Sequence, residues 1–374
     1  MDALATPSNW QRVRLGDVGK PCMCKRVMKH QTTRYGEIPF YKIGTFGNTA
    51  DAFISKKLFL EYKTKYSFPK KGDILISASG TIGRAVIYDG KPAYFQDSNI
   101  VWIDNDETLV KNDFLFYVYS HVKWNTEHTT ILRLYNDNFR NTLIPLPPLN
   151  EQIAIANILS DVDRYLYSLD ALILKKESIK KALSFELLSQ RKRLKGFSQA
   201  WQRVRLGDIC EITTGSLDAN EMVHYGKYRF YTCAKEYYFI DKYAFDTEAI
   251  LISGNGYVGY VHYYKGKFNA YQRTYVLDNF SEHIMFVKYF LTMFLQSHIQ
   301  TNRNEGNIPY IVMATLKDFE IFLPPLNEQI AIANILSDLD HEIISLKNKK
   351  RQFENIKKAL NHDLMSAKIR VLKK

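Results

Sequence analysis

The sequence has few cysteines and no apolar run long enough to cross a bilayer. Four of the 374 residues are cysteine, and the Cys22-x-Cys24 pair has neither the spacing nor the second pair that a zinc site requires. We therefore expect free thiols. The longest apolar stretch, residues 284–295, is interrupted by Lys288, whereas a membrane helix needs about 20 apolar residues. We expect a cytoplasmic chain without a membrane segment.

The sequence also lacks the motifs of nucleotide and methyl-donor chemistry. It contains no GxxxxGK[ST] loop, no GxGxxG opening a helix and no Asn-Pro-Pro-aromatic word of the kind that grips a flipped adenine. We expect no catalytic residue, no cofactor and no metal. One alternative stays open: Asp51, Glu61 and Lys63 resemble the carboxylates and lysine of a magnesium-dependent nuclease, although a lysine-rich exposed face explains them equally well.

Two words of the sequence occur twice without a change. LPPLNEQIAIANILSD spans Leu146–Asp161 and Leu323–Asp338, and WQRVRLGD spans Trp10–Asp17 and Trp201–Asp208. The two words alternate along the chain, with divergent sequence between them. The chain therefore consists of two copies of one unit, each with a fixed frame around a variable insert.

The net charge of +12 is unevenly distributed. Residues 1–149 carry 20 basic and 14 acidic side chains, a net charge of +6, whereas residues 196–326 carry 12 and 13, a net charge of −1. A polyanionic partner is plausible on this balance. The second insert cannot depend on bulk charge, and it holds 14 of the 25 tyrosines.

The longer duplicated word predicts a long helix in each copy. Pro147 and Pro148 end the preceding strand, Asn150 is a suitable N-cap, and no glycine or proline follows before Gly196. Apolar residues then recur at alternating spacings of four and three, at Ile155, Leu159, Val162, Leu166, Leu169 and Ile173, and in the second copy at Ile332, Leu336, Leu339, Ile343 and Leu346. This stripe predicts an antiparallel coiled coil of the two helices, interrupted at Lys176, Lys180, Lys350 and Lys357.

The two inserts retain traces of a common origin. Aligning ILIS at Ile74–Ser77 with ILIS at Ile250–Ser253 superposes, without a gap, Gly80, Gly83, Gly90, Lys91 and Gln96 on Gly256, Gly259, Gly266, Lys267 and Gln272. Runs of β-branched and aromatic residues between glycines predict strands joined by tight turns. The expected fold is α+β: two mostly-β domains separated by two long α-helices, with a pseudo-two-fold internal repeat.

This order of words resembles the specificity subunit of a type I restriction-modification system, and the SASGTIGR and FQDS words are typical of its recognition domains. Asn150 and Asn327 stand where that family usually has proline. The resemblance implies target-recognition domains at 1–149 and 196–326 and conserved helical arms at 150–195 and 327–374. It implies a non-catalytic subunit on bipartite double-stranded DNA, with two methyltransferase subunits and restriction/translocase subunits.

Candidate DNA-binding residues follow from what base edges require. Arg or Lys reads guanine and Asn or Gln reads adenine, with Ser, Thr and Tyr in support, whereas lysines bind phosphates. In the first insert the candidates are Ser79, Thr81, Arg84, Gln96, Ser98, Asn99, Arg133, Asn136 and Asn138, with Lys70 and Lys71 as phosphate contacts. In the second insert they are Asn255, Tyr257, Gln272, Arg273, Thr274, Asn302, Arg303 and Asn304.

Overall fold

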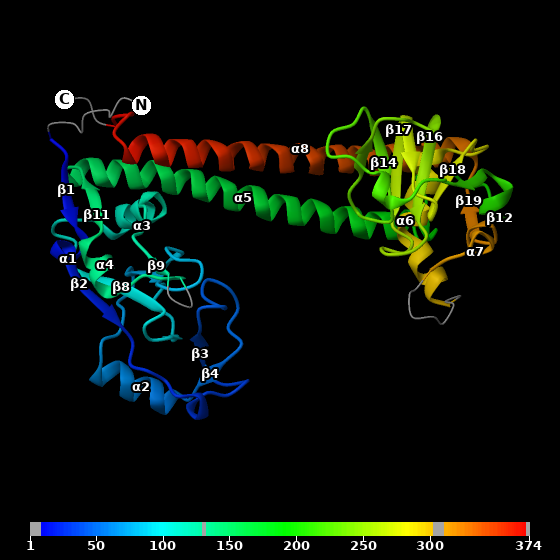
Figure 1. Cartoon of the computed structure of the whole chain (residues 1–374). Helices are drawn as coiled ribbons and strands as arrows, with labels where there is room; N and C mark the ends of the chain where they lie inside the picture. Colours follow the sequence, from blue (N-terminus) through cyan, green and yellow to red (C-terminus); the bar gives the residue numbers. More distant parts are fainter. Residues whose placement is uncertain (1–8, 129–131, 302–309, 372–374) are drawn as a thin grey trace. The chain divides into compact units, whose positions relative to one another are not determined.

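The computed structural model describes residues 9–128, 132–301 and 310–371 (Figure 1). The chain divides into two compact units, the first formed by Met1–Leu169 with Lys349–Lys374 and the second by Asp170–Asn348. Each unit contains one insert and a part of both long helices. The first unit therefore joins the beginning and the end of the chain.

The first unit is built around a four-stranded sheet in the order β2-β8-β5-β6, beside a three-stranded sheet in the order β4-β3-β7. A separate ladder pairs β1 with β11, so the two ends of the insert lie side by side. Its elements are β1 (Gln11–Arg14), α1 (Leu15–Val18), β2 (Gly19–Met23), η1 (Lys29–Gln31), β3 (Ile38–Tyr41), β4 (Phe53–Ile54), α2 (Lys56–Lys65), β5 (Ile74–Ser77), β6 (Ala85–Ile87), β7 (Tyr94–Phe95), β8 (Ile100–Asn105), α3 (Asn112–His121), β9 (Glu127–His128), β10 (Leu132–Arg133), α4 (Asn136–Asn141) and β11 (Leu143–Leu146).

The second unit has one six-stranded sheet in the order β13-β18-β16-β17-β14-β15, and a ladder of β12 with β19 that matches β1 with β11. Its first four strands repeat the order of the first unit's four-stranded sheet. Its elements are β12 (Gln202–Arg205), η2 (Leu206–Asp208), β13 (Glu211–Thr214), η3 (Ala219–Glu221), β14 (Tyr228–Tyr231), β15 (Tyr238–Ile240), β16 (Phe245–Ser253), β17 (Val261–Ala270), β18 (Thr274–Asp278), α6 (Ile284–Thr301), α7 (Met313–Lys317) and β19 (Glu320–Leu323).

The aligned glycines have the same backbone conformation in both units. The φ angles are +64° and +60° for Gly80 and Gly256, +82° and +73° for Gly83 and Gly259, and +87° and +130° for the third pair. These values lie in the region that favours glycine, so the same turns require it in both copies. The duplication read from the sequence is confirmed.

The match between the inserts slips by two residues after the aligned stretch. Ser77 pairs with Ile100 and Ser253 pairs with Thr274, so the first members are 176 residues apart and the second members 174. The amide of Ala78 donates to the carbonyl of Asn99, and the amide of Gly254 donates to that of Arg273. Asn99 and Arg273 therefore occupy equivalent places, which a gapless alignment does not show.

The inserts differ most on one sheet face. In the first unit α2 packs Phe59 into a core with Leu75 and Trp102. In the second unit residues 232–244, between β14 and β16, contain β15 and no helix. There the guanidinium of Arg229 lies between two tyrosine rings, 4.3 Å from the centroid of Tyr237 and 4.5 Å from that of Tyr264. Stacked tyrosines cover the face that α2 covers in the first unit.

The long helices α5 (Leu149–Leu188) and α8 (Leu326–Met365) begin one residue earlier than predicted. The carbonyl of Pro148 accepts hydrogen bonds from the amides of Glu151 and Gln152, so Asn150 lies inside the first turn and its prediction as the N-cap is wrong. The helix α5 also ends before Gly196. The chain leaves it through Gln190, whose φ is +62°.

The antiparallel pairing of α5 with α8 is confirmed inside each unit. In the first unit the ring of Tyr165 packs on that of Phe353, with centroids 4.6 Å apart. In the second unit Lys176 forms an ion pair with Glu342 at 2.8 Å, and Lys347 one with Glu177 at 2.7 Å. The predicted core positions are buried, among them Ile155, Leu159, Leu169 and Ile173 of α5 and Ile332, Leu336 and Ile343 of α8.

Candidate nucleic-acid interface

A glycine turn follows the central strand of each sheet and carries several candidate side chains. The amide of Gly83 donates to the carbonyl of Ser77 at 2.9 Å, and that of Gly259 donates to Ser253 at 2.7 Å. A Cβ on Gly83 would lie 2.2 Å from Nε1 of Trp124. The turn is thus fixed by its backbone conformation and by close packing.

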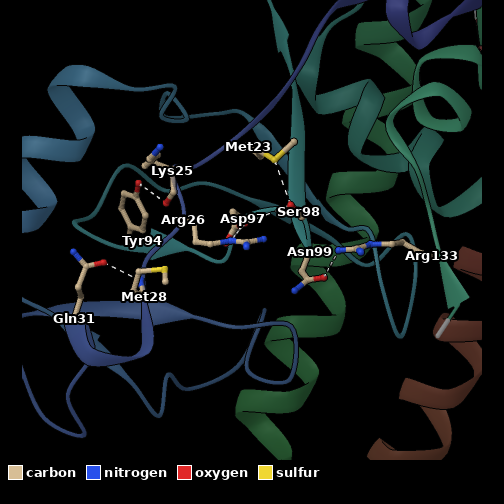
Figure 2. A network of polar contacts seen from close by, with 10 residues as sticks. All are labelled: Met23, Lys25, Arg26, Met28, Gln31, Tyr94, Asp97, Ser98, Asn99 and Arg133. Carbon is tan, nitrogen blue, oxygen red and sulfur yellow. Dashed lines mark hydrogen bonds and ion pairs between the residues drawn. The ribbon is translucent and has the colours of Figure 1, made fainter. Parts of the chain in front are cut away.

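In the first unit three segments converge beside this turn (Figure 2). The side-chain oxygen Oδ1 of Asn99 accepts a hydrogen bond from Oγ of Ser79 at 2.8 Å and another from Nη2 of Arg133 at 3.3 Å. A β-bridge also joins Ser79 to Arg133. The sequence-predicted residues Ser79, Asn99 and Arg133 therefore form one cluster, in which the amide is braced and Ser79 is buried.

A second polar group adjoins that cluster in Figure 2. Nε of Arg26 donates to the carboxylate of Asp97 at 2.8 Å, and Oγ of Ser98 lies 3.4 Å from the same carboxylate. Ser98 has a φ of +61°. Arg26 is two-thirds exposed and was not among the candidates, because nothing in its sequence context marks it. Its pairing with Asp97 reduces the repulsion that a carboxylate would exert on phosphate.

Three predicted residues have structural partners inside the first unit. Nη1 of Arg84 donates to the carbonyl of Phe46 at 3.0 Å, and Oε1 of Gln96 accepts from the amide of Ile43 at 3.0 Å. The carbonyl of Thr81 accepts from the hydroxyl of Ser77, while its side chain is exposed. Arg84 and Gln96 hold loops together, which a base-contact argument from residue type does not anticipate.

The remaining candidates of the first insert lie on α4. Asn136, the first residue of this helix, is exposed, and Asn138 is half-buried with its carbonyl accepting from Oγ1 of Thr142 at 2.7 Å. The chain enters α4 directly from Arg133 and Leu134. These asparagines therefore follow the Asn99 cluster in sequence, on a separate element.

In the second unit Arg273 takes the place of Asn99. A cavity of about 280 Å³ beside it is lined by Gly254, Gln272, Arg273, Tyr275 and Ile311. Gln272 and Arg273 are exposed, whereas Tyr275 is buried and donates its hydroxyl to the carbonyl of Ile311 at 2.9 Å. Burial raises the pKa of Tyr275 against the opposing effect of Arg273, so its hydroxyl stays a donor.

Other candidates in the second insert are placed less uniformly. Tyr257 is 54% exposed, with Nζ of Lys235 5.0 Å from its ring centroid, and Asn255 is half-buried. Thr274 is fully buried, with Oγ1 3.8 Å from Sγ of Cys233, so its side chain has no access to DNA. Asn302, Arg303 and Asn304 lie outside the described residues.

The predicted phosphate contacts are exposed but not equivalent. Nζ of Lys70 lies 3.0 Å from Oδ1 of Asp104, and this ion pair raises the pKa of Lys70. Lys71 is exposed beside the turn at Gly90. Binding of phosphate by Lys70 therefore competes with Asp104, whereas Lys71 has no such printed competitor.

The side chains of the nuclease alternative do not form a site. Asp51 pairs with Lys42 at 2.8 Å, Glu61 pairs with Lys65 at 3.0 Å, and Lys63 lies over the ring of Phe68. Within residues 9–128, 132–301 and 310–371, no group of three or more His, Cys, Asp or Glu side chains could hold a metal ion. Nothing in the structure supports this alternative.

Across the part of the chain that the structure describes, no helix combines the length and apolar character that a membrane span requires.

Comparison with known proteins gives a consistent result. A family model, the type I restriction modification DNA specificity domain, matches residues 7–180 and 198–355. A putative type I restriction enzyme specificity subunit of Haemophilus influenzae is 64% identical over 148 residues, 39% of this chain and 38% of that protein. The Escherichia coli type I restriction enzyme EcoDI specificity subunit is 38% identical over 169 residues, 44% of this chain and 37% of that protein. The matches thus span about two-fifths of either relative.

A solved structure extends the likeness to the whole fold. The crystal structure of a type I restriction-modification S subunit from M. genitalium has a TM-score of 0.68 to this chain and covers 97% of both chains. Its sequence identity is 19%, so the comparison bears on the fold alone.

Proposed function

The chain belongs to the family of type I restriction modification DNA specificity domains, and from this membership we propose that it gives a restriction-modification complex its DNA sequence specificity without catalysing a reaction. We assign one half of a bipartite double-stranded DNA target to each recognition domain, residues 1–149 and 196–326. The arms, residues 150–195 and 327–374, hold the partners. Cytoplasmic DNA is the substrate of the complex.

The observation that carries this proposal is the equivalence of Asn99 and Arg273. Both residues begin the strand that pairs with the central strand, beside the glycine turn, and both have a side chain of a type that reads bases. One frame thus presents an amide in one unit and a guanidinium in the other. Two inserts that differ at the same place suit a target with two different half-sites.

The chemistry of each cluster suggests its role. Arg273, with Gln272 beside it on an open cavity, has the donors for a bidentate contact to guanine. In the first domain Arg133 orients the amide of Asn99, which suits adenine. Lys71 and, after release from Asp104, Lys70 bind phosphates, which position the domain without selecting sequence.

The exposed faces of the arms support two copies of one partner. Leu149, Ile153 and Tyr167 on α5 are matched, each 177 residues later, by the exposed Leu326, Ile330 and Ile344 on α8. Residues four and fourteen apart lie within about 40° of each other around an α-helix, so each set forms one stripe. Repeated apolar stripes suit two methyltransferase subunits, one on each arm, with restriction/translocase subunits joining the assembly.

A direct test is to map methylated adenines in the genome of a host that carries the cognate methyltransferase, with and without this gene. We expect one bipartite methylated motif that disappears with the gene. An unchanged methylation pattern after deletion would contradict the proposal. Purification of the methyltransferase with this chain should give a two-to-one complex.

A further inference from the structure

A tyrosine, an aspartate and a lysine meet where the first recognition domain contacts both helical arms. The hydroxyl of Tyr117, on α3, donates to Oδ2 of Asp163, on α5, at 2.9 Å. Nζ of Lys357, on α8, lies 2.5 Å from the other oxygen of Asp163 and 5.6 Å from the centroid of the Tyr117 ring. One carboxylate thus connects the recognition domain to the arm that follows it and to the opposite arm.

The same arrangement recurs in the second unit. The hydroxyl of Tyr289, on α6, donates to Oδ2 of Asp340, on α8, at 2.7 Å, and Lys180, on α5, donates to Oδ1 of Asp340. Nζ of Lys180 lies 5.4 Å from the centroid of the Tyr289 ring. Each aspartate and lysine of the second triad is 177 residues from its counterpart in the first.

The triads are partly shielded from solvent. The side chains of Asp163 and Lys357 are 35% and 30% exposed, and those of Asp340 and Lys180 are 27% and 26% exposed. In the second triad, burial tends to raise the pKa of Asp340, but the bonds from Lys180 and Tyr289 lower it on balance. A charge-assisted network of this kind restricts geometry more than an exposed ion pair does.

We propose that these two triads are positioning elements that fix the orientation of each recognition domain on the arms, and that each domain depends on a lysine from the arm that follows the other domain. Lys357 lies in the arm after the second domain but holds the first domain. Lys180 lies in the arm after the first domain but holds the second. This inference rests on the proposed function, because orientation matters only when each domain reads a half-site.

Loss of one lysine should weaken discrimination at one half-site. A single wrong base pair weakens specific binding about tenfold or more. If the first domain can rock, its base contacts contribute less, so Lys357→Met should reduce the penalty for a mismatch in the first domain's half-site to about threefold. The penalty at the other half-site should not change. Lys180→Met should give the reverse pattern.

The experiment compares these variants in the assembled methyltransferase complex, with binding measured on the target and on targets altered in either half-site. Lys357→Arg and Lys180→Arg retain the charge and should restore most discrimination. Lys192→Met, at an exposed lysine with a 4.0 Å contact to Glu186, is the surface control and should behave as the unmodified protein. If Lys357→Met does not assemble, Tyr117→Phe removes only the hydroxyl and should act on the same half-site.

The outcomes separate the inference from the function on which it rests. Equal changes at both half-sites, unchanged penalties in the lysine variants, or an effect of Lys357→Met on the second domain's half-site would each overturn the inference. An unmodified complex that binds altered and unaltered targets equally would instead overturn the proposed function.

Discussion

Arg193 donates two hydrogen bonds to the buried carboxylate of Glu328, from Nε to Oε1 at 2.8 Å and from Nη2 to Oε2 at 2.7 Å. The same pair recurs between Arg370 and Glu151, at 2.8 and 3.0 Å. Each arginine follows one long helix, and each glutamate lies in the first turn of the other. The end of one helix is thereby joined to the start of its antiparallel partner inside each unit.

Removal of either arginine should destabilise the corresponding unit. Arg370→Met leaves Glu151 buried with one remaining side-chain donor, Nε1 of Trp10 at 3.0 Å, and should lower the free energy of unfolding by about 3 kcal/mol. Arg193→Met should be more severe, because Nε1 of Trp201 is buried without a hydrogen-bond partner and does not replace the lost donors. Urea unfolding followed by circular dichroism measures both. Equal effects would contradict the role given to Trp10.

Base readout and phosphate binding should separate by mutation. Arg273→Ala should reduce affinity for the target by about 1 to 3 kcal/mol and relax one base position, because a bidentate guanine contact is lost. Lys71→Ala should weaken binding to every sequence alike and lower the slope of log affinity against log salt by about one unit. Binding of the complex to target and random duplexes over a salt series distinguishes them. Equal loss on both duplexes for Arg273→Ala would refute its assignment.

The glycine turn should tolerate no side chain at Gly83. Gly83→Ala combines a φ of +82° with a collision of Cβ with the ring of Trp124, whereas Gly72→Ala, at a φ of +95°, meets nothing within 4 Å. We expect Gly72→Ala to cost about 1 to 2 kcal/mol of stability from backbone strain alone. Gly83→Ala should cost at least about 1 kcal/mol more because of the added overlap. Thermal unfolding of both variants checks the difference, and similar losses would mean that Trp124 moves aside freely.

Much of the fold follows from the sequence because the two copies constrain each other. The heptad positions from Ile155 to Ile173 predict the antiparallel pair, and ILIS marks the central strand of both sheets. The start of α5 was misplaced because Asn150 is a good N-cap by type, whereas the carbonyl of Pro148 accepts the first bonds.

The candidate site was predicted less completely, because residue type does not reveal which partner a side chain takes. Gln96 and Arg84 have the chemistry of base contacts but bind loop backbone instead. Thr274 faces the interior because it lies in the strand pair with Ser253. The equivalence of Asn99 and Arg273 depends on strand register, which is hidden by a two-residue length difference between the inserts.

The stability of the second unit should fall on mild acidification. Burial lowers the pKa of His262 below 6.5, against the opposing hydrogen bond with the carbonyl of Ala234. The unfolded chain then binds a proton more readily than the folded one, so the contribution of His262 is present above about pH 6.5 and is lost as pH falls below it. His262→Asn should show a shallower pH dependence of the unfolding free energy between about pH 7.5 and 5.5. The same slope in both proteins would exclude His262 as a cause.

The central claim, that each insert independently selects one half of the DNA target, is tested most directly by exchanging one insert and mapping the methylated sequence. Replacing residues 18–142 with the corresponding segment of a relative keeps the β1 and β11 ladder and both arms. Because the first unit packs its insert on the arms through this retained frame, we expect a methylated motif with one new half-site and one unchanged half-site. A motif in which both halves change, or neither does, would contradict the account.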